Sequence, residues 1–141
     1  MKNKWLAAED YTAIINLMGK YQHLVDDGDE AGWADLFTED GAFLGLAAED
    51  GSSDGYRGRE GLMKIPRLNM TRFGGNFRHN ICSFSAQYGD TTDEAFARYY
   101  VIGVLSTKGE GSRVVMQVDV QTHLLKIDGE WKIKSNHMHM L

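Results

Sequence analysis

Two ionisable residues that lie far apart in the sequence, Asp26 and His79, are the strongest candidates for chemistry in this chain. Asp26 lies where an N-terminal helical pattern ends, and the negative end of a helix dipole disfavours a carboxylate there. His79 lies in a strand pattern between Phe77 and Ile81, so its imidazole should point toward the apolar face of a sheet. If the fold brings the two together, they form a carboxylate–imidazole pair that can move protons.

Such a pair suits the elimination of water or a halide from carbon. A neutral imidazole can accept a C–H proton at about pH 7. A carboxylate bonded to the other ring nitrogen fixes the tautomer and stabilises the imidazolium that forms. We therefore expect His79 to be the general base and Asp26 its orienting partner. The leaving group or a carbonyl oxygen could be bound by the hydroxyl of a tyrosine: Tyr21, Tyr56, Tyr99 or Tyr100.

Several other side chains suit the wall of a pocket, although each also has a purely structural interpretation. Methionines such as Met63 adapt well to an irregular apolar ligand, but they fill protein cores equally well. His137 alternates with Trp131 on the last strand pattern, so the two should share one face of that strand. The residues that we expect to contact a substrate are Tyr56, Tyr99, Met63, Trp131 and His137.

The composition is that of an ordinary globular chain. Its 141 residues fit one domain, residues 1–141, with 43% hydrophobic and 25% charged residues. A net charge of −5 argues against a nucleic-acid binder, and the scattered Lys and Arg argue against a membrane surface. The apolar stretch near the N-terminus is too short for a signal peptide, so we expect a cytoplasmic protein.

Neither a metal nor a cofactor is predicted. The single cysteine, Cys82, excludes an internal disulfide and a cysteine-rich zinc site. His137 and His139 could bind a metal together with His123 or Asp119, but an ordinary strand accounts for both.

The order of the predicted elements indicates an α+β fold. Three helices are expected first. One covers 10–26 with Asp10 as N-cap, a short one follows an Asp29 cap, and the third covers 59–69 with a kink at Pro66. A short strand over 42–46 and a loop or ragged hairpin over 47–58 separate the last two helices. Four long strands follow, and Asp128-Gly129 is a strong hairpin signal. Their ranges are 76–88, 94–107, 112–127 and 131–140.

Several motifs together resemble the SnoaL-like branch of the nuclear transport factor 2-like superfamily. They span nearly the whole chain, and it is their order that is specific. The resemblance implies a cone in which a strongly curved antiparallel sheet and three helices enclose a pocket. The motifs are Tyr21-x4-Asp26, Gly28-Asp29, Trp33-x-x-Leu36-Phe37-x-Glu39-Asp40-Gly41, Tyr56-x-Gly58-Arg59-Glu60-Gly61-Leu62, Arg78-His79-Asn80 and Asp128-Gly129-Glu130-Trp131-Lys132-Ile133.

Within that superfamily the chain is most similar to scytalone dehydratase, bile acid 7α-dehydratase and lindane dehydrochlorinase. This resemblance implies that Asp26 and His79 face each other inside the cone and that Tyr21 belongs to the site. The chain also departs from the group. On the following strand, around 99–103, it lacks the second acid of the bile acid enzyme and the second histidine of scytalone dehydratase. It also has no basic residue that matches the one in the lindane enzyme.

The function that we expect is a cofactor-independent lyase of the dehydratase kind, or an isomerase, acting on a hydrophobic small molecule. A non-catalytic ligand-binding module of the same fold and the small subunit of a ring-hydroxylating dioxygenase are the alternatives. The strand over 112–127 has one polar and one apolar face, and such a long flat surface often packs against a second copy. We therefore expect a homodimer or a higher homo-oligomer.

Overall fold

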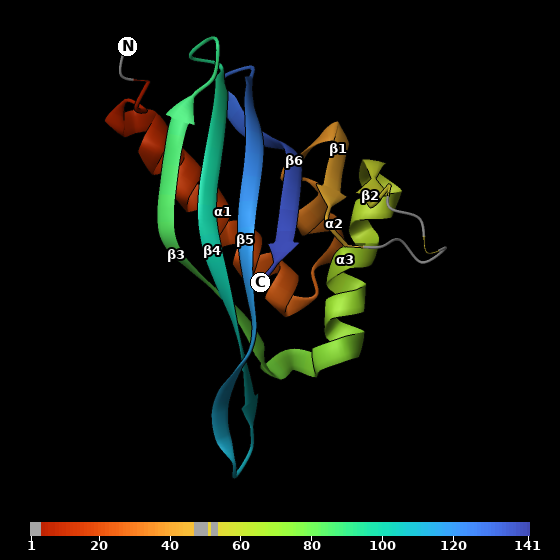
Figure 1. Cartoon of the computed structure of the whole chain (residues 1–141). Coiled ribbons are helices and arrows are strands. Elements are labelled where there is room, and N and C mark those ends of the chain that lie inside the picture. The colour runs from red at the N-terminus through yellow and green to blue at the C-terminus, as the bar shows by residue number, and fades with distance from the viewer. Residues whose placement is uncertain (1–3, 47–50, 52–53) are drawn as a thin grey trace.

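The structure is a computed structural model that describes residues 4–46, 51 and 54–141, and within them it has three α-helices and a curved six-stranded sheet. The predicted α+β class is confirmed. The strand order is β2-β1-β6-β5-β4-β3, and β1 and β6 form a parallel pair in an otherwise antiparallel sheet. In Figure 1, α1 crosses behind the sheet and α3 stands beside β1 and β2. The elements are α1 (Ala8–Asp27), α2 (Glu30–Ala34), β1 (Phe37–Leu44), β2 (Tyr56–Arg57), α3 (Gly58–Phe73), a 3₁₀ turn (Gly74–Asn76), β3 (Phe77–Tyr88), β4 (Glu94–Thr107), β5 (Gly111–Ile127) and β6 (Glu130–Met140).

Helix α1 forms where the apolar residues recur at three- and four-residue spacing, and it buries Ile14, Met18, Tyr21 and Val25 on one face. The helix ends at Gly28 as predicted, because this glycine adopts a left-handed φ of 73° that other residues rarely tolerate. This termination leaves Asp26 in the last turn of the helix, on its buried side.

The predicted N-cap of α1 is wrong. The helix begins at Ala8, and Ala7 is the N-cap residue without a side-chain capping bond. Asp10 lies instead in the first turn, where its buried carboxylate accepts hydrogen bonds from Trp131 Nε1 at 3.0 Å and Lys126 Nζ at 3.2 Å. The sequence could not reveal this role because both partners are more than 100 residues away.

The segment after α1 follows the prediction in outline. Asp29 caps α2, accepting a hydrogen bond from the backbone N–H of Gly32 at 2.9 Å. Strand β1 begins at Phe37, five residues earlier than predicted, because it pairs with β6 along this extra length. The predicted loop over 47–58 falls partly outside the described residues, and its end forms the short strand β2.

Helix α3 runs without a break through Pro66 and ends at Phe73, four residues beyond the predicted end. Its face toward the interior of the fold repeats at Ile65, Leu68, Asn69 and Arg72, which is the helical i, i+3, i+4, i+7 spacing. The extra turn matters because it carries Arg72 to the site described below.

The four long strands lie almost where the sequence predicts them. Asp128 and Gly129 have φ values of 52° and 79°, and positive φ at both central residues is the type I′ hairpin geometry. β-Bulges interrupt β3, β5 and β6, however, and the two in β3 and β6 reverse the alternation of strands that carry site residues. In β3, Ser83 has a φ of 54° and the ladder shifts between Cys82 and Ser85. In β6, Ile133 pairs with Leu124 but Ser135 pairs with His123, so one residue between them is extra.

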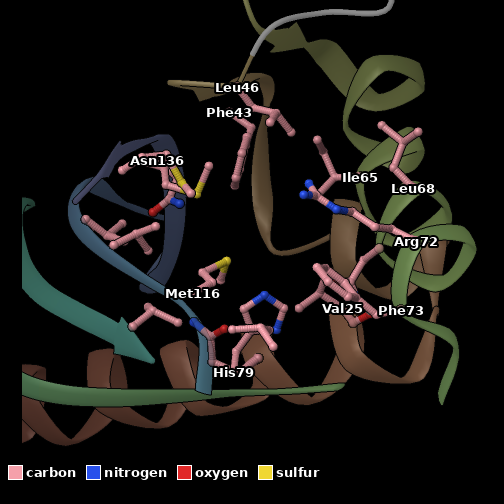
Figure 2. A pocket seen from close by; sticks show the side chains of 18 of the residues that line it. Val25, Phe43, Leu46, Ile65, Leu68, Arg72, Phe73, His79, Met116 and Asn136 are labelled. Carbon is pink, nitrogen blue, oxygen red and sulfur yellow. The ribbon is translucent and has the colours of Figure 1, made fainter. Parts of the chain in front are cut away.

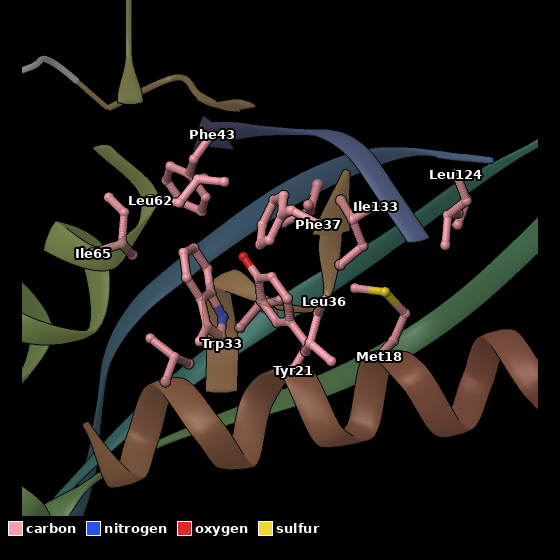
Figure 3. Packing of buried hydrophobic residues seen from close by; sticks show 14 of the residues in the cluster. Met18, Tyr21, Trp33, Leu36, Phe37, Phe43, Leu62, Ile65, Leu124 and Ile133 are labelled. Carbon is pink, nitrogen blue, oxygen red and sulfur yellow. The ribbon is translucent and has the colours of Figure 1, made fainter. Parts of the chain in front are cut away.

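The hydrophobic core lies between α1, α2 and the sheet (Figure 3). Its centre is the fully buried Trp33, whose ring contacts Tyr21, Phe37 and Phe43 at centroid distances of 5.1, 4.8 and 6.1 Å. Burying each large apolar side chain stabilises the fold by about 1.5–3 kcal/mol. Among the described residues, no helix is both long and apolar enough to cross a membrane.

Candidate active site

A cavity of about 590 Å³ opens between the C-terminal half of α1, helix α3 and strands β4 to β6 (Figure 2). Its volume lies in the range of small-molecule sites, roughly 300–1,000 Å³. Most of its wall is apolar, which excludes water and strengthens electrostatic interactions within it. The apolar lining residues include Val25, Phe43, Leu46, Ile65, Leu68, Phe73, Val101, Met116, Val118, Val120, Met138 and Met140.

Asp26 and His79 meet at the wall of this cavity. The Nδ1 atom of His79 lies 2.5 Å from Oδ1 of Asp26, and the backbone N–H of His79 donates to Oδ2 at 3.1 Å. The carboxylate is 4% exposed and lies behind the imidazole, which is 15% exposed and lines the cavity. With Nδ1–H donated to the carboxylate, Nε2 carries the lone pair, which is the arrangement of a general base.

The imidazole is held in place by neighbours from β3, the end of α3 and β4. The ring of the fully buried Phe77 meets the imidazole edge-on, with ring centroids 4.7 Å apart. Phe73 stacks on Phe77 with ring centroids 4.1 Å apart. Gly103, the partner of His79 on β4, makes room for this packing. A Cβ atom at Gly103 would lie 2.3 Å from Cζ of Phe77, which is far inside van der Waals contact.

A second group of polar side chains is centred on Asn136 of β6. Its Nδ2 donates to the hydroxyl of Tyr21 at 3.1 Å, while Oδ1 accepts from Tyr99 at 3.2 Å and from Thr122 at 2.5 Å. Since the hydroxyl of Tyr21 accepts from Asn136, its own proton can be donated to a ligand. Burial raises the pKa of both Tyr21 and Tyr99, so the two phenols stay protonated at neutral pH.

Of the predicted site residues, the structure brings Tyr21, Tyr99 and His79 to the cavity, with Asp26 directly behind His79. The other five do not line it: Tyr56, Tyr100, Met63, Trp131 and His137. Tyr56 is buried on β2 at the edge of the sheet, and Met63 lies on a side of α3 away from its cavity-lining residues. Trp131 donates to Asp10 beside the N-terminal end of α1.

His137 points away from the cavity because of the bulge in β6. A regular strand would place Trp131, Ile133 and His137 on one face, as predicted. The extra residue between Ile133 and Ser135 reverses this order, so Asn136 and Met138 line the cavity. His137 and His139 lie on the exposed side, with ring centroids 4.2 Å apart.

Five polar residues at the cavity were missed by the sequence reasoning: Gln22, Asn69, Arg72, Arg113 and Asn136. For Gln22 a signal existed, since it lies one helical turn before Asp26 on the same helix. Arg72 continues the Ile65 stripe of α3, but the predicted helix ended before it. Nothing in the sequence pattern distinguishes Asn136 or Arg113. Within the described ranges, no group of three or more His, Cys, Asp or Glu is arranged to hold a metal ion.

Comparison with known proteins agrees with this fold. The family model described as a SnoaL-like domain matches residues 7–137. The protein Aln2 from a Streptomyces species superposes with a TM-score of 0.84 at 19% identity, covering 97% of this chain and 94% of its own. A Catenulispora acidiphila protein in complex with S-DNPA superposes with a TM-score of 0.76 at 22% identity, with 95% of each chain covered.

A putative scytalone dehydratase from Novosphingobium aromaticivorans superposes with a TM-score of 0.74 at 23% identity, covering 94% of this chain and 84% of its own. At such identities these three structures show a shared fold. No curated protein matches the sequence.

Proposed function

The chain belongs to the SnoaL-like domain family, and from this premise we propose that it is a cofactor-independent lyase of the dehydratase kind, or an isomerase. Members of the superfamily are dehydratases, cyclases or ligand binders. One observation carries the proposal: the imidazole of His79 lines an apolar cavity with Nδ1 bonded to a buried carboxylate. This arrangement supplies a neutral base in a site that excludes water.

In the proposed elimination, Nε2 of His79 takes a proton from the carbon next to an activating group of the substrate. The negative charge of Asp26 stabilises the imidazolium that results. The hydroxyl of Tyr21 donates a hydrogen bond to the carbonyl or departing oxygen, supported by Asn136 on its other side. The departing hydroxide then receives the proton held by His79, so the products are an alkene and water and the enzyme is restored.

The isomerase reaction uses the same groups, since His79 can return its proton to a different carbon of the substrate. The dehydratase is favoured because a hydroxyl donor, Tyr21, lines the same cavity as the base, and a poor leaving group such as hydroxide needs one. The absence of turnover with retained ligand binding would instead indicate a non-catalytic ligand carrier.

The test is a screen of cyclic and polycyclic β-hydroxy ketones for loss of water, followed by mass spectrometry and ultraviolet absorbance. The comparison is between wild type, His79→Gln and a matched control, His23→Gln, in which an exposed histidine of α1 is changed in the same way. Removal of the base should lower kcat by about 10²–10⁴-fold. Unchanged kcat in His79→Gln, with a native circular dichroism spectrum, would refute the assignment.

A further inference from the structure

The wall of the cavity carries positive charge in a protein that is acidic as a whole. The chain has a net charge of −5, yet none of the described residues that line the cavity is Asp or Glu. The carboxylate of Asp26 lies behind His79 and is bonded to it twice. Two guanidinium groups, those of Arg72 and Arg113, line the cavity from opposite elements, α3 and β5. The local field therefore favours an anion.

Arg72 is exposed, and its contact with the protein is a cation–π interaction rather than an ion pair. Figure 2 shows its side chain reaching from α3 toward the cavity, beside Ile65. Within residues 4–46, 51 and 54–141 it makes no hydrogen bond or ion pair, and its guanidinium carbon lies 5.2 Å from the ring centre of Phe73. Arg59 and Arg98, by contrast, form ion pairs with Asp35 and Asp119.

The positive charge of Arg72 in the last turn of α3 interacts favourably with the helix dipole, but that interaction does not require the side chain to turn toward an apolar cavity. Arg113 repeats the situation on β5, since it also lacks an ion pair or hydrogen bond in the described part of the chain while lining the cavity. Both arginines are exposed, and together they place two positive charges, one from a helix and one from a strand, at one cavity.

Gln22 provides an independent sign that the ligand has polar atoms. This residue is 6% exposed and lines the cavity, but its side-chain amide forms no hydrogen bond with any residue that the structure describes. The polar atoms of this amide are not enclosed by protein, so they face the cavity and can bind a polar group that enters it.

We propose that the ligand of this cavity is an organic acid, with an apolar ring system in the cavity and a carboxylate bound at its rim by Arg72 and Arg113. The planar guanidinium fork matches the two oxygens of a carboxylate. The inference rests on the proposed function only in taking this cavity as the substrate site. The anion then fixes one end of the substrate, and the apolar wall holds the ring near Nε2 of His79.

The experiment compares an acid with its neutral isostere by isothermal titration calorimetry, using naphthylacetate and naphthylacetamide. The proteins are wild type, Arg72→Gln, Arg113→Gln, the double variant, and the control Lys108→Gln, which removes one charge from the exposed tip of the β4–β5 hairpin. Wild type should bind the acid about tenfold or more tightly than the amide. This preference should fall to about twofold or less in the double variant and persist in Lys108→Gln.

Added salt should weaken binding of the acid and leave binding of the amide nearly unchanged. Equal or tighter binding of the amide in wild type would overturn the proposal, as would a preference that survives in the double variant. Failure of both compounds to bind would also overturn it, because rings of this size fit the cavity. His79→Gln in the same assay should keep the acid preference, so binding is tested apart from catalysis.

Discussion

At the scale of single residues, the decisive feature is that Asp26 binds His79 through both of its oxygens. The contact between Oδ1 and Nδ1 fixes the imidazole ring, and Oδ2 accepts the hydrogen bond of the His79 backbone N–H. Because β3 is the edge strand of the sheet, an outward N–H on it would otherwise lack a partner. Asp26 thus secures the position of the base as well as its tautomer.

We predict that Asp26→Asn changes the protonation of His79 without unfolding the protein. The amide can donate a hydrogen bond to Nδ1, which would shift the imidazole proton to Nε2 and remove the basic lone pair from the cavity. The ¹⁵N shifts of the imidazole should report this change, and kcat on any substrate found should fall by about 10²–10⁴-fold. Asp27→Asn, which alters an exposed neighbour, is the matched control. An Asp26→Asn spectrum identical to that of the control would contradict the assignment.

At the scale of elements, α1 is tied to the sheet at both ends. Its last turn holds His79 of β3, and its first turn holds Asp10, which binds Trp131, Lys126 and the hydroxyl of Tyr88. Burial raises the pKa of Asp10, but these three hydrogen bonds outweigh burial and keep its pKa below the ordinary value of 3.8. The carboxylate therefore stabilises the fold when it is ionised.

This lowered pKa predicts a pH-dependent loss of stability. The contribution of Asp10 is present above the pKa of the unfolded chain and is lost as the pH falls through the lower pKa of the folded state. Asp10→Asn should therefore lower the Tm at pH 7, and the difference in Tm between this variant and wild type should become smaller below about pH 4. Thermal unfolding followed by circular dichroism measures both, with Glu9→Gln, an exposed change in the same turn, as control. If the difference in Tm between wild type and Asp10→Asn stayed the same from neutral to acid pH, Asp10 would be acting by packing alone.

The bulges in β3 and β6 also show how far the sequence could predict this site. Asp26 and His79 were singled out by their places in a helix pattern and a strand pattern, while the family resemblance implied that they face each other and that Tyr21 belongs to the site. Trp131 and His137 were assigned to one face because an unbroken strand alternates, and the bulge in β6 reverses that alternation. The ladder partners that produce a bulge come from another strand, so the local pattern carries no sign of it.

At the scale of the whole molecule, the sheet has a second face that is not covered by the helices. Side chains on β4 alternate, so Tyr99 and Val101 are buried while Phe96 and Arg98 point outward. Phe96 is 44% exposed and stacks on His123 of β5 with ring centroids 4.5 Å apart. This outer face suits a second copy of the chain.

We predict a homodimer or a higher homo-oligomer formed through this outer face. Ile102 lies on the outward side of β4 and is half-buried, so Ile102→Lys should weaken the association by placing a charge there. Sedimentation equilibrium should give about twice the chain mass of 15.8 kDa, or more, for wild type and a smaller mass for the variant. Thr92→Lys, in an exposed loop, controls for added charge. A wild type that sediments as a monomer at every concentration would refute the prediction.

The bulge in β6 has a consequence for how this scaffold can acquire new chemistry. The same strand holds an amide, Asn136, on its inner side and two imidazoles, His137 and His139, on its outer side. A mutation that removed the bulge by shifting the strand after Ile133 one residue along β5, rather than by deleting a residue, would exchange the two sets without altering the identity of any of these three residues. A loss of the irregularity would thus deliver a pair of nitrogen ligands to the interior in one evolutionary step.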